Sequence, residues 1–328
     1  MKYLRSLDRL LLATIALCLA STAAAQGSGW PTRPLKLIVP FPAGGASDIV
    51  ARFLAEKLGP ELGQPVVIDN KPGASSLIGA QAAAASPADG YTLLLGSTAS
   101  LVTNQFLFKK LPYDPQAFEP IALLGIQPMV LVANTNVAAS NVGDLMKSPK
   151  ARDGGMSYAS FGAGTQSHLA LEMLNIRSGT KMTHVPYKGA AEALPALIGG
   201  YVQLYVDVVT TSLPYLKTGQ VKALGVASAQ RSAILPNVPT IAEQGLAGFD
   251  MTPWIGLVVL KGTPTEAIDK LRRATDNVMK QPAVIEKMIS LGQETPAAGN
   301  SAAALTAQIQ ADTPKIGKLL KDARIEPQ

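Results

Sequence analysis

A strand, a glycine turn and an amphipathic helix follow one another between residues 35 and 58, and this unit constrains the fold of the chain most. Leu35–Val39 is a short apolar run followed closely by prolines, which favours a buried strand. Gly44 and Gly45 can adopt backbone angles that other residues resist. From Ile49 onward, apolar residues recur at helical spacing. The sequence therefore predicts a β–α unit of the kind from which parallel sheets are built.

The turn of this unit is a candidate anion site. A glycine turn directly before a helix leaves backbone N–H groups unpaired. With the positive end of the helix dipole, they point at whatever lies above the strand. An ordinary structural β–α turn is the alternative, and this stretch favours neither interpretation.

The alternation of strands and helices continues along the chain, which predicts parallel strands with helices on both faces of a sheet. Further strands are expected at Pro65–Asn70, Tyr91–Leu95, Met156–Ser160, Met182–Tyr187, Val202–Val206 and Val221–Ala227. At 328 residues, the chain is long enough for two domains of ordinary size. Apolar runs at 121–132 and 254–260 are candidate crossings between two lobes, and the part from 265 to 323 is helical by its pattern.

Residues 1–25 have the pattern of a cleaved secretory signal peptide. Three basic residues precede the apolar run Leu10–Ala20, and Ala23–Ala25 supplies the small residues of a cleavage site. The apolar run is too short to span a bilayer. Cys18, the only cysteine in the sequence, lies in this run, so the chain after cleavage would contain none. We therefore expect a secreted protein without disulfides.

Charge and aromatic content argue against a nucleic-acid partner. The formal net charge is +6, and it becomes +4 once the leader, with three basic residues and one acid, is removed. Basic residues are scattered, and only 5% of the residues are aromatic. A nucleic-acid interface needs a clustered basic surface or aromatic side chains that stack on bases. A mildly positive field instead helps to capture small anions.

A second glycine turn, Phe161–Gln166, follows another strand and opens another helix. In open α/β sheets, ligands bind beyond the carboxyl ends of strands, so two such turns that face each other could hold one anion. Each hydrogen bond to an ionised carboxylate contributes roughly 1.5–3 kcal/mol, and micromolar affinity needs about 8 kcal/mol. A few such bonds are therefore enough. Two unrelated structural turns are the alternative.

The motifs of common α/β enzymes are incomplete. Gly162–Ser167 carries two glycines of a dinucleotide fingerprint, but Ser167 occupies the third place, and His184 stands where an acidic residue would hold a ribose. No G-x-S-x-G elbow occurs. His168 and His184 are the only histidines and lack the spacing of a metal site, so we interpret both as polar residues hydrogen-bonded near a turn. No cofactor, metal or catalytic residue is expected.

Two aspartates stand at turns. Asp48 is placed to cap the helix that begins beside it, which is the commonest use of Asp there. Asp207 ends an apolar strand, where its carboxylate would point into a cleft and could accept a hydrogen bond from an amine, a hydroxyl or a water. A salt bridge or a turn cap is the alternative for Asp207, and both interpretations stay open.

Eight motifs give the chain a specific family resemblance. In family order they are Val39-PFPAGGASD-Ile49, Asn70-KPGAS-Ser76, Asp89-GYTLLLG-Ser97, Lys110-LPYDP-Gln116, Ser157-YASFGAGTQS-His168, His184-VPYKGAA-Glu192, Leu235-PNVPTIAEQG-Leu246 and Gly262-TP-Thr265. With these motifs the chain resembles the solute-binding proteins of tripartite tricarboxylate transporters, the Bug (Bordetella uptake gene) family. The resemblance implies an α/β, two-lobed periplasmic-binding-protein fold of type II-like form, with mostly parallel sheets flanked by helices and a ligand cleft between the lobes.

The resemblance also implies a function. It is that of a non-catalytic periplasmic receptor, monomeric, which closes on a small carboxylated organic acid and delivers it to the membrane subunits of a tripartite tricarboxylate transporter. The first domain would comprise residues 30–125 and 252–328, and the second domain residues 126–251, in agreement with the two candidate crossings.

In the family, the ligand carboxylate is bound by two turns, often with bridging waters. At the matching positions of this chain, the resemblance implies that the two glycine turns bind it. The candidates are Ala43, Gly44, Gly45, Ser47 and Asp48 in the first lobe, Phe161, Gly164, Thr165 and Asp207 in the second, and in addition Ser97 and His168.

One loop departs from the family pattern. Members usually read R-P-G-A-G-G-N where this chain has Lys71-Pro-Gly-Ala-Ser-Ser-Leu77. The loss of two glycines stiffens the turn, and Leu77 replaces an amide by an apolar side chain. If the loop borders the cleft, the distal end of the ligand is expected to be less polar than a tricarboxylate.

Two other functions stay open on the sequence. A carboxylate sensor for a signalling system would use the same binding chemistry as the receptor. A secreted α/β enzyme, either a dehydrogenase or a hydrolase, would need the motifs that are incomplete in this chain.

Overall fold

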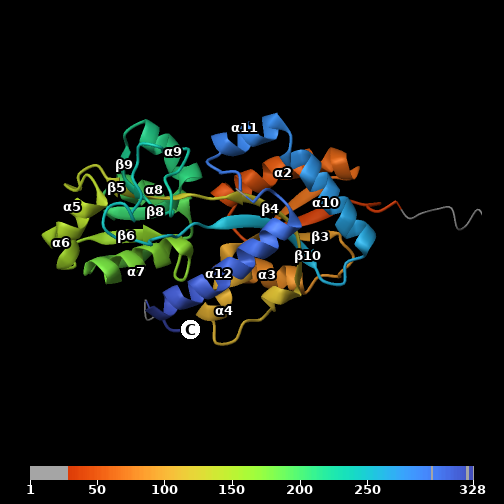
Figure 1. Ribbon diagram of the computed structural model, residues 1–328, viewed down its shortest axis with the longest axis horizontal. Coiled ribbons are helices and arrows are strands. Elements are labelled where there is room, and N and C mark those ends of the chain that lie inside the picture. Colours follow the sequence, from red (N-terminus) through yellow and green to blue (C-terminus); the bar gives the residue numbers. More distant parts are fainter. Residues whose placement is uncertain (1–28, 297, 323–324, 328) are drawn as a thin grey trace, which may run out of the picture.

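The structure is a computed structural model that describes residues 29–296, 298–322 and 325–327. Two five-stranded sheets lie side by side along the longest axis, each flanked by helices (Figure 1). We name the part built around the sheet that contains β1 the first lobe, and the part built around the sheet that contains β6 the second lobe. The predicted signal peptide, residues 1–25, lies outside the described residues.

The first lobe contains a sheet in the order β2–β1–β3–β10–β4. Its strands are β1 (Leu35–Val39), β2 (Val66–Asn70), β3 (Thr92–Ser97), β4 (Phe118–Ile126) and β10 (Trp254–Leu260). β1 pairs in parallel with β2 and β3, whereas β10 runs antiparallel to β3 and β4. The three parallel strands therefore end at the same edge of the sheet.

Alternating side chains bury both faces of this sheet. Leu35 and Leu37 pack with the helices α2 and α10, whereas Ile38 faces the opposite side, as the two-residue period of a strand requires. The helices of this lobe are α2 (Ala46–Leu62), α3 (Leu77–Ala84), the π-helix η1 (Ala99–Thr103), α4 (Asn104–Leu107), the 3₁₀ helix η2 (Pro115–Ala117), α10 (Thr265–Met279), α11 (Pro282–Ser290) and α12 (Ala302–Asp322).

The second lobe repeats this plan with the order β7–β6–β8–β5–β9. Its strands are β5 (Met129–Asn134), β6 (Ser157–Ser160), β7 (Thr183–Pro186), β8 (Leu204–Val208) and β9 (Val221–Val226). β6 pairs in parallel with β7 and β8, and β5 runs antiparallel to β8 and β9. The helices are α5 (Val142–Lys147), α6 (Pro149–Arg152), α7 (Gln166–Ser178), α8 (Ala190–Ile198) and α9 (Val209–Lys217).

The chain crosses between the sheets twice. β4 belongs to the first sheet and β5 to the second, so the first crossing falls at residues 127–128, and the chain returns between β9 and β10. These crossings and the parallel half of each sheet confirm the two-lobed α/β fold. The antiparallel strands β5 and β10 make both sheets mixed. The domain boundaries at 125/126 and 251/252 stay a prediction.

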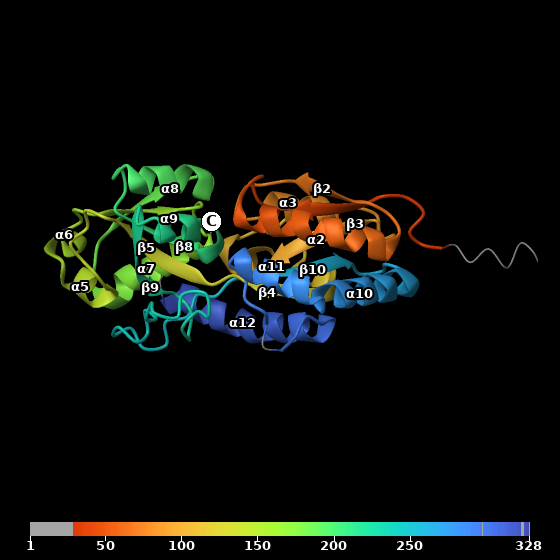
Figure 2. The same ribbon diagram turned by 90° about the horizontal axis from the view of Figure 1, so that it is seen from above.

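One apolar core runs from one lobe into the other. It includes Leu123 and Trp254 of the first sheet, Leu131 of the second sheet and Leu174 of α7. In Figure 2, α12 runs along the lower edge of both lobes. The Asp312 carboxylate in α12 accepts a 2.7 Å hydrogen bond from Nε1 of the fully buried Trp254. The lobes are therefore joined by packing along α12 as well as by the crossing strands.

Most predicted elements are present, with ends displaced by a few residues. The predicted strand Leu35–Val39 has the bounds of β1, whereas the predicted strand Tyr91–Leu95 corresponds to β3, Thr92–Ser97. The part from 265 to 323, predicted as helical, consists of α10, α11 and α12, with a break of irregular backbone after α11. The π-helix η1 was not predicted, because its unusual hydrogen-bond register has no periodic signal in five residues.

The loop between β2 and α3 holds three consecutive non-glycine residues in the left-handed region. Their φ angles are 45° at Ala74, 54° at Ser75 and 71° at Ser76. No other non-glycine residue in the described ranges has a positive φ. The left-handed conformation costs an L-residue roughly 1–2 kcal/mol. This chain therefore keeps a glycine-like turn although it lacks the two glycines of the family pattern.

We expect Ala74→Gly to raise the free energy of unfolding by about 0.5–1 kcal/mol, because relief of the left-handed strain exceeds the added unfolded-state entropy of glycine. Ala74 is exposed, so little packing is lost. The matched control is Ala85→Gly, since Ala85 is also exposed but has a φ of −86°, and this variant should not be stabilised. Urea titration measures the free energy of unfolding of both variants. If both substitutions change it by the same amount, the backbone at Ala74 is not strained.

Candidate functional site

The turn after β1 leads into a helix whose N-terminus has no side-chain cap. Gly44 has a φ of 78°, and Gly45 is the N-cap of α2, where no described side chain accepts a capping hydrogen bond. The N–H groups in the first turn of a helix have no partner within the helix. Ala43 and Gly44 are exposed, whereas Ser47 is 5% exposed. The turn therefore leaves backbone donors available at the positive end of a 17-residue helix.

Asp48 stabilises this turn from the inside. Its Oδ2 accepts hydrogen bonds from Gly44 N–H at 2.8 Å and Arg52 Nε at 2.9 Å, and its Oδ1 accepts one from Asn70 Nδ2 at 2.8 Å. Burial acts to raise the pKa of Asp48, but the hydrogen bonds from Arg52, Gly44 and Asn70 and the Arg52 charge lower it overall. Asp48 is not the N-cap that the sequence predicted. It bonds back to the glycine turn instead, and both of its oxygens are occupied by protein donors.

Ser47 and Ser97 belong to segments at the carboxyl ends of two neighbouring parallel strands of the first sheet. β3 pairs with β1, so Ser97 at the end of β3 lies next to the turn that follows β1. The Ser97 N–H donates to Ser100 Oγ at 3.0 Å. Nε2 of Gln127, in the first crossing, lies 3.4 Å from Ser47 Oγ. The predicted serines are therefore mostly buried and already have polar neighbours.

The turn after β6 has the same hydrogen-bonding pattern as the turn after β1. Gly164 has a φ of 75°, and its N–H donates to His168 Nδ1 at 3.1 Å. The spacing of four residues is the same as between Gly44 and Asp48. Thr165 is the N-cap of α7, and its Oγ1 accepts the His168 N–H at 3.5 Å. In each turn, a side chain from the following helix accepts the N–H of a left-handed glycine.

Both histidines lie behind the second turn. The ring centroids of His168 and His184 are 4.2 Å apart, and those of His184 and Tyr158 are 5.1 Å apart. His184 Nε2 lies 2.6 Å from Ser160 Oγ. Burial lowers the pKa of His168, and burial together with the neighbouring His168 lowers the pKa of His184 to about 4. Both rings are therefore neutral near pH 7 and hydrogen-bonded near a turn, as the sequence predicted.

Asp207 is a fully buried carboxyl group in β8. Its Oδ2 accepts hydrogen bonds from Thr211 Oγ1 at 2.5 Å and Ser212 Oγ at 2.7 Å. Thr211 and Ser212 leave its Oδ1 free, and the buried Tyr205 hydroxyl, which has no other partner within the described residues, lies close enough to the carboxyl group to lower its pKa. Burial raises the pKa of Asp207 to about 6. Phe161 packs edge-on against Tyr205, with 5.8 Å between ring centroids. Thr211 and Ser212 therefore account for one oxygen of Asp207, and the Tyr205 hydroxyl is a further polar neighbour of the carboxyl group.

Each of the two turns borders the opposite lobe. A Cβ atom on Gly189, which precedes α8, would lie 3.7 Å from Pro42 Cγ in the first turn. The Ser75 Oγ lies 3.5 Å from the carbonyl oxygen of Gly164 in the second turn. The structure thus brings the predicted turns of both lobes to one junction.

Three of the predicted residues lie behind the turns. Asp48 and His168 bond to turn glycines, and Asp207 is enclosed by its own lobe. Two residues that sequence reasoning did not single out also belong to this region, namely Asn70 and Gln127. Asn70 had an available signal, because it is a polar residue at the carboxyl end of an apolar strand. Gln127 had none, because only the crossing places it beside the first turn.

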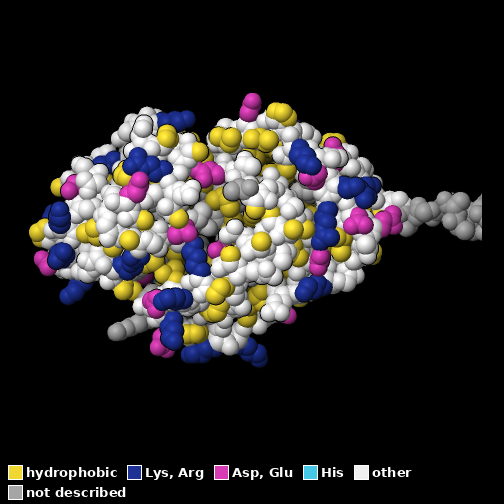
Figure 3. Space-filling model, viewed as in Figure 1, with side chains coloured by type: hydrophobic (Ala, Val, Ile, Leu, Met, Phe, Trp, Pro, Cys, Tyr) yellow, Lys and Arg dark blue, Asp and Glu magenta, His cyan; other side chains and the backbone are white. Residues whose placement is uncertain are grey.

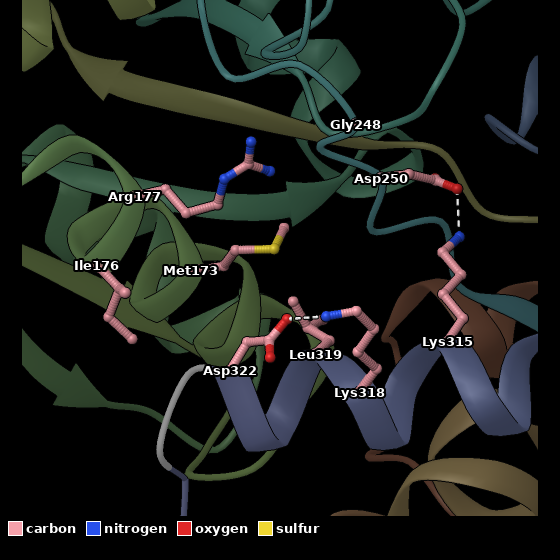
Figure 4. Close-up of a pocket in the computed structure, with 9 residues that line it drawn as sticks. All are labelled: Met173, Ile176, Arg177, Gly248, Asp250, Lys315, Lys318, Leu319 and Asp322. Carbon is pink, nitrogen blue, oxygen red and sulfur yellow. Dashed lines mark hydrogen bonds and ion pairs between the residues drawn. The ribbon is translucent and has the colours of Figure 1, made fainter.

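A separate hollow of about 270 Å³ lies between α7 and α12 (Figure 4). It is lined by Met173, Ile176, Arg177, Gly248, Asp250, Lys315, Lys318, Leu319 and Asp322, and by none of the predicted site residues. Lys315 pairs with Asp250, Lys318 pairs with Asp322, and Arg177 donates to a backbone carbonyl. Because these basic side chains already have partners, we interpret the hollow as part of the boundary between the lobes and not as a candidate anion site.

The surface carries no dense basic patch on the face shown in Figure 3, where lysine and arginine side chains are scattered among acidic ones. Within the described ranges, no helix is both long and apolar enough to cross a bilayer. In the same ranges, no three His, Cys, Asp or Glu side chains are grouped so that they could hold a metal ion.

Comparison with known proteins finds a matching family and relatives of nearly full length. Residues 50–325 match the sequence profile of the family described as tripartite tricarboxylate transporter family receptor. The protein BugT of Bordetella pertussis is 37% identical over 287 residues, which cover 86% of this chain and 88% of BugT.

Three solved structures share the fold across both lobes. The R. palustris protein Rpa4515 with adipate has a TM-score of 0.85 at 32% identity, over 91% of this chain and 100% of that one. The periplasmic binding protein BugD has a TM-score of 0.84 at 37% identity, over 91% and 100%. MatC from Rhodopseudomonas palustris, with bound malate, has a TM-score of 0.82 at 31% identity, over 89% and 100%.

We expect His184 to make the protein less stable as the pH falls from 7 to 5. An unfolded histidine, with a pKa of about 6.5, takes up a proton in this range. Folded His184, with a pKa of about 4, does not, so the unfolded state binds more protons and is favoured. His184→Asn should therefore flatten the decrease in the free energy of unfolding, measured by urea titration at each pH.

Asp207 provides a control of opposite sign. Its folded pKa of about 6 lies above that of an unfolded aspartate, so the folded state gains the proton first as the pH falls. Asp207→Asn should therefore steepen the same decrease. Parallel pH profiles for the unmodified protein and both variants would contradict these assignments.

Proposed function

The chain belongs to the tripartite tricarboxylate transporter receptor family, and we propose that it captures a small carboxylated organic acid between its two lobes. Its family and its solved relatives are substrate-binding receptors rather than enzymes. The observation that carries the proposal is that both glycine turns border the opposite lobe at the lobe junction, each directly before a helix N-terminus. Relatives hold adipate and malate, which supports an acid with two carboxylates as the ligand class.

One carboxylate would lie on the turn after β1. The uncapped first turn of α2 supplies N–H donors, and hydrogen bonds to a carboxylate are worth roughly 1.5–3 kcal/mol each. Three such bonds, less the cost of ordering the ligand, match the roughly 8 kcal/mol of a micromolar complex. Arg52 balances the charge of Asp48, so the buried carboxylate behind the turn repels a bound anion less.

The proposed roles of the site residues follow from their positions. The contact residues are Ala43, Gly44, Gly45, Ser47 and Ser97 in the first lobe and Phe161, Gly164 and Thr165 in the second. Asp48 and His168 keep the two turns in shape, because each accepts the N–H of a turn glycine. Asp207 is proposed as an acceptor for a ligand hydroxyl or a bridging water, through the Oδ1 atom that Thr211 and Ser212 leave free.

Capture would serve transport. The lobes would close on the acid in the periplasm, where residues 1–25 would direct the chain before their removal. The closed monomer would then deliver the acid to the membrane subunits of a tripartite tricarboxylate transporter. The family assignment supports this partnership, and it disfavours the secreted enzyme that the sequence left open.

Adipate or malate should raise the melting temperature in a concentration-dependent way, because only the folded state binds the acid. At a ligand concentration of 100 times Kd, the stabilisation is about 2.7 kcal/mol. The matched control is adipamide, which has the length of adipate but no charge and should give no shift. A broad panel of mono-, di- and tricarboxylates without any shift would refute the proposed function.

Asp207→Asn should weaken the binding of malate more than that of succinate, which lacks the hydroxyl group. The loss of a charged acceptor corresponds to about tenfold or more in Kd for the hydroxy acid. Isothermal titration of both acids against both proteins gives the comparison. If the two acids lose affinity equally, Asp207 supports the lobe and does not contact the ligand.

A further inference from the structure

The loop between β2 and α3 connects the interior of the first lobe to the second lobe through Ser75. Its Oγ lies 3.5 Å from the carbonyl oxygen of Gly164, so the hydroxyl can donate across the junction. Its own carbonyl accepts a 2.9 Å hydrogen bond from Nδ2 of the fully buried Asn104. The same Nδ2 lies 3.1 Å from the hydroxyl of Tyr113. Ser75 therefore has one partner in each lobe.

Helix α4 supports the same second-lobe turn. A Cβ atom on Gly164 would lie 2.8 Å from Cδ1 of Leu107, the last residue of α4. Gln166, at the start of α7, donates its Nε2 to Thr103 Oγ1 at 3.1 Å, and both residues are buried. The second glycine turn thus packs on a first-lobe surface that consists of the loop with Ser75 and the segment from Thr103 to Leu107.

The peptide groups of Gly164 are held by one residue from each lobe. Its N–H donates to His168 in the second lobe at 3.1 Å, and its carbonyl faces Ser75 in the first lobe. The orientation of this part of the turn therefore depends on whether the lobes are together.

Ser75 occupies its position in spite of backbone strain. Its φ of 54° lies in the left-handed region, as do those of Ala74 and Ser76 beside it. Strain of this kind persists where the surroundings over-determine the backbone, and it occurs at ligand clamps and switch regions. A glycine at this place would remove the strain, but it would also remove the hydroxyl group that reaches Gly164.

We propose that Ser75 is a positioning residue for lobe closure. Its hydroxyl donates to the Gly164 carbonyl and keeps the second glycine turn against the first lobe, in the arrangement in which both turns can face one acid. The inference rests on the proposed function for its purpose, whereas the contact is a property of the chain alone. Loss of the hydroxyl should shift the lobes toward larger separations, and a substitute donor should restore part of the short separation.

The test is the inter-lobe distance in the ligand-free chain, measured by pulsed electron paramagnetic resonance. Spin labels are attached at Glu56→Cys on α2 and Lys150→Cys on α6, both exposed sites, in a Cys18→Ser background that removes the native cysteine. We expect Ser75→Ala to reduce the population at the short distance by about 2-fold, the lower end of the range for one neutral hydrogen bond, because the 3.5 Å contact is long. Ser75→Asn should recover part of it, because asparagine tolerates the left-handed region and carries an amide donor.

Ala74→Gly is the matched control. It relieves strain in the same loop but leaves the Ser75 hydroxyl in place, so it should raise the melting temperature without changing the distances. Identical distance populations in Ser75→Ala and the unmodified chain would overturn the proposal. A shift of equal size in Ala74→Gly, or no recovery in Ser75→Asn, would overturn it as well. Because no acid is present, a failed acid-binding screen would refute the proposed function and leave this result unaffected.

Discussion

The two chain crossings constrain the rest of the structure. β5 and β10 each enter the interior of a sheet after the chain has come from the other lobe, and each pairs with a neighbour on both sides. An interior strand cannot shift by one residue without turning its buried side chains to the wrong face. Each crossing strand is therefore fixed in its own sheet, and the chain links the two sheets at both crossings. The core along α12 adds packing between the lobes, and the turns that follow β1 and β6 both lie at the lobe junction.

The two glycine turns share one hydrogen-bonding pattern, but the side chains that accept the bond differ in charge. A glycine N–H donates to the side chain four residues later, which is Asp48 in the first lobe and His168 in the second. The Asp48 carboxylate is anionic and is balanced by Arg52. The His168 imidazole must be neutral to accept through Nδ1, and burial favours that state. Both turns can therefore be rigid without placing an uncompensated negative charge beside a bound anion.

Sequence reasoning recovered the elements whose signals are local. The strand Leu35–Val39 has its predicted bounds, because it is a short apolar run between turn residues. The run at 254–260, predicted as a crossing, is strand β10 of the first sheet, and the return crossing precedes it. The apolar run at 121–132 was correctly interpreted as a crossing. Its division into β4 and β5 was not predicted, because it depends on which strands of the two sheets pair with each half of the run. The turn glycines were found because a positive φ favours glycine. The use of Asp48 as an internal brace was missed, because it requires Arg52 and Asn70 to converge on one carboxylate.

The sequence by itself determined where backbone donors could be exposed, since the order of strand, glycine turn and helix is a property of neighbouring residues. It also determined the family, through motifs spread along the chain. Only the tertiary structure decided which side chains support those turns and which reach across the junction. Ser75 and Gly164 are 89 positions apart, and no spacing rule connects them. Their contact exists because two separately built sheets pack with the ends of their parallel strands at the same place.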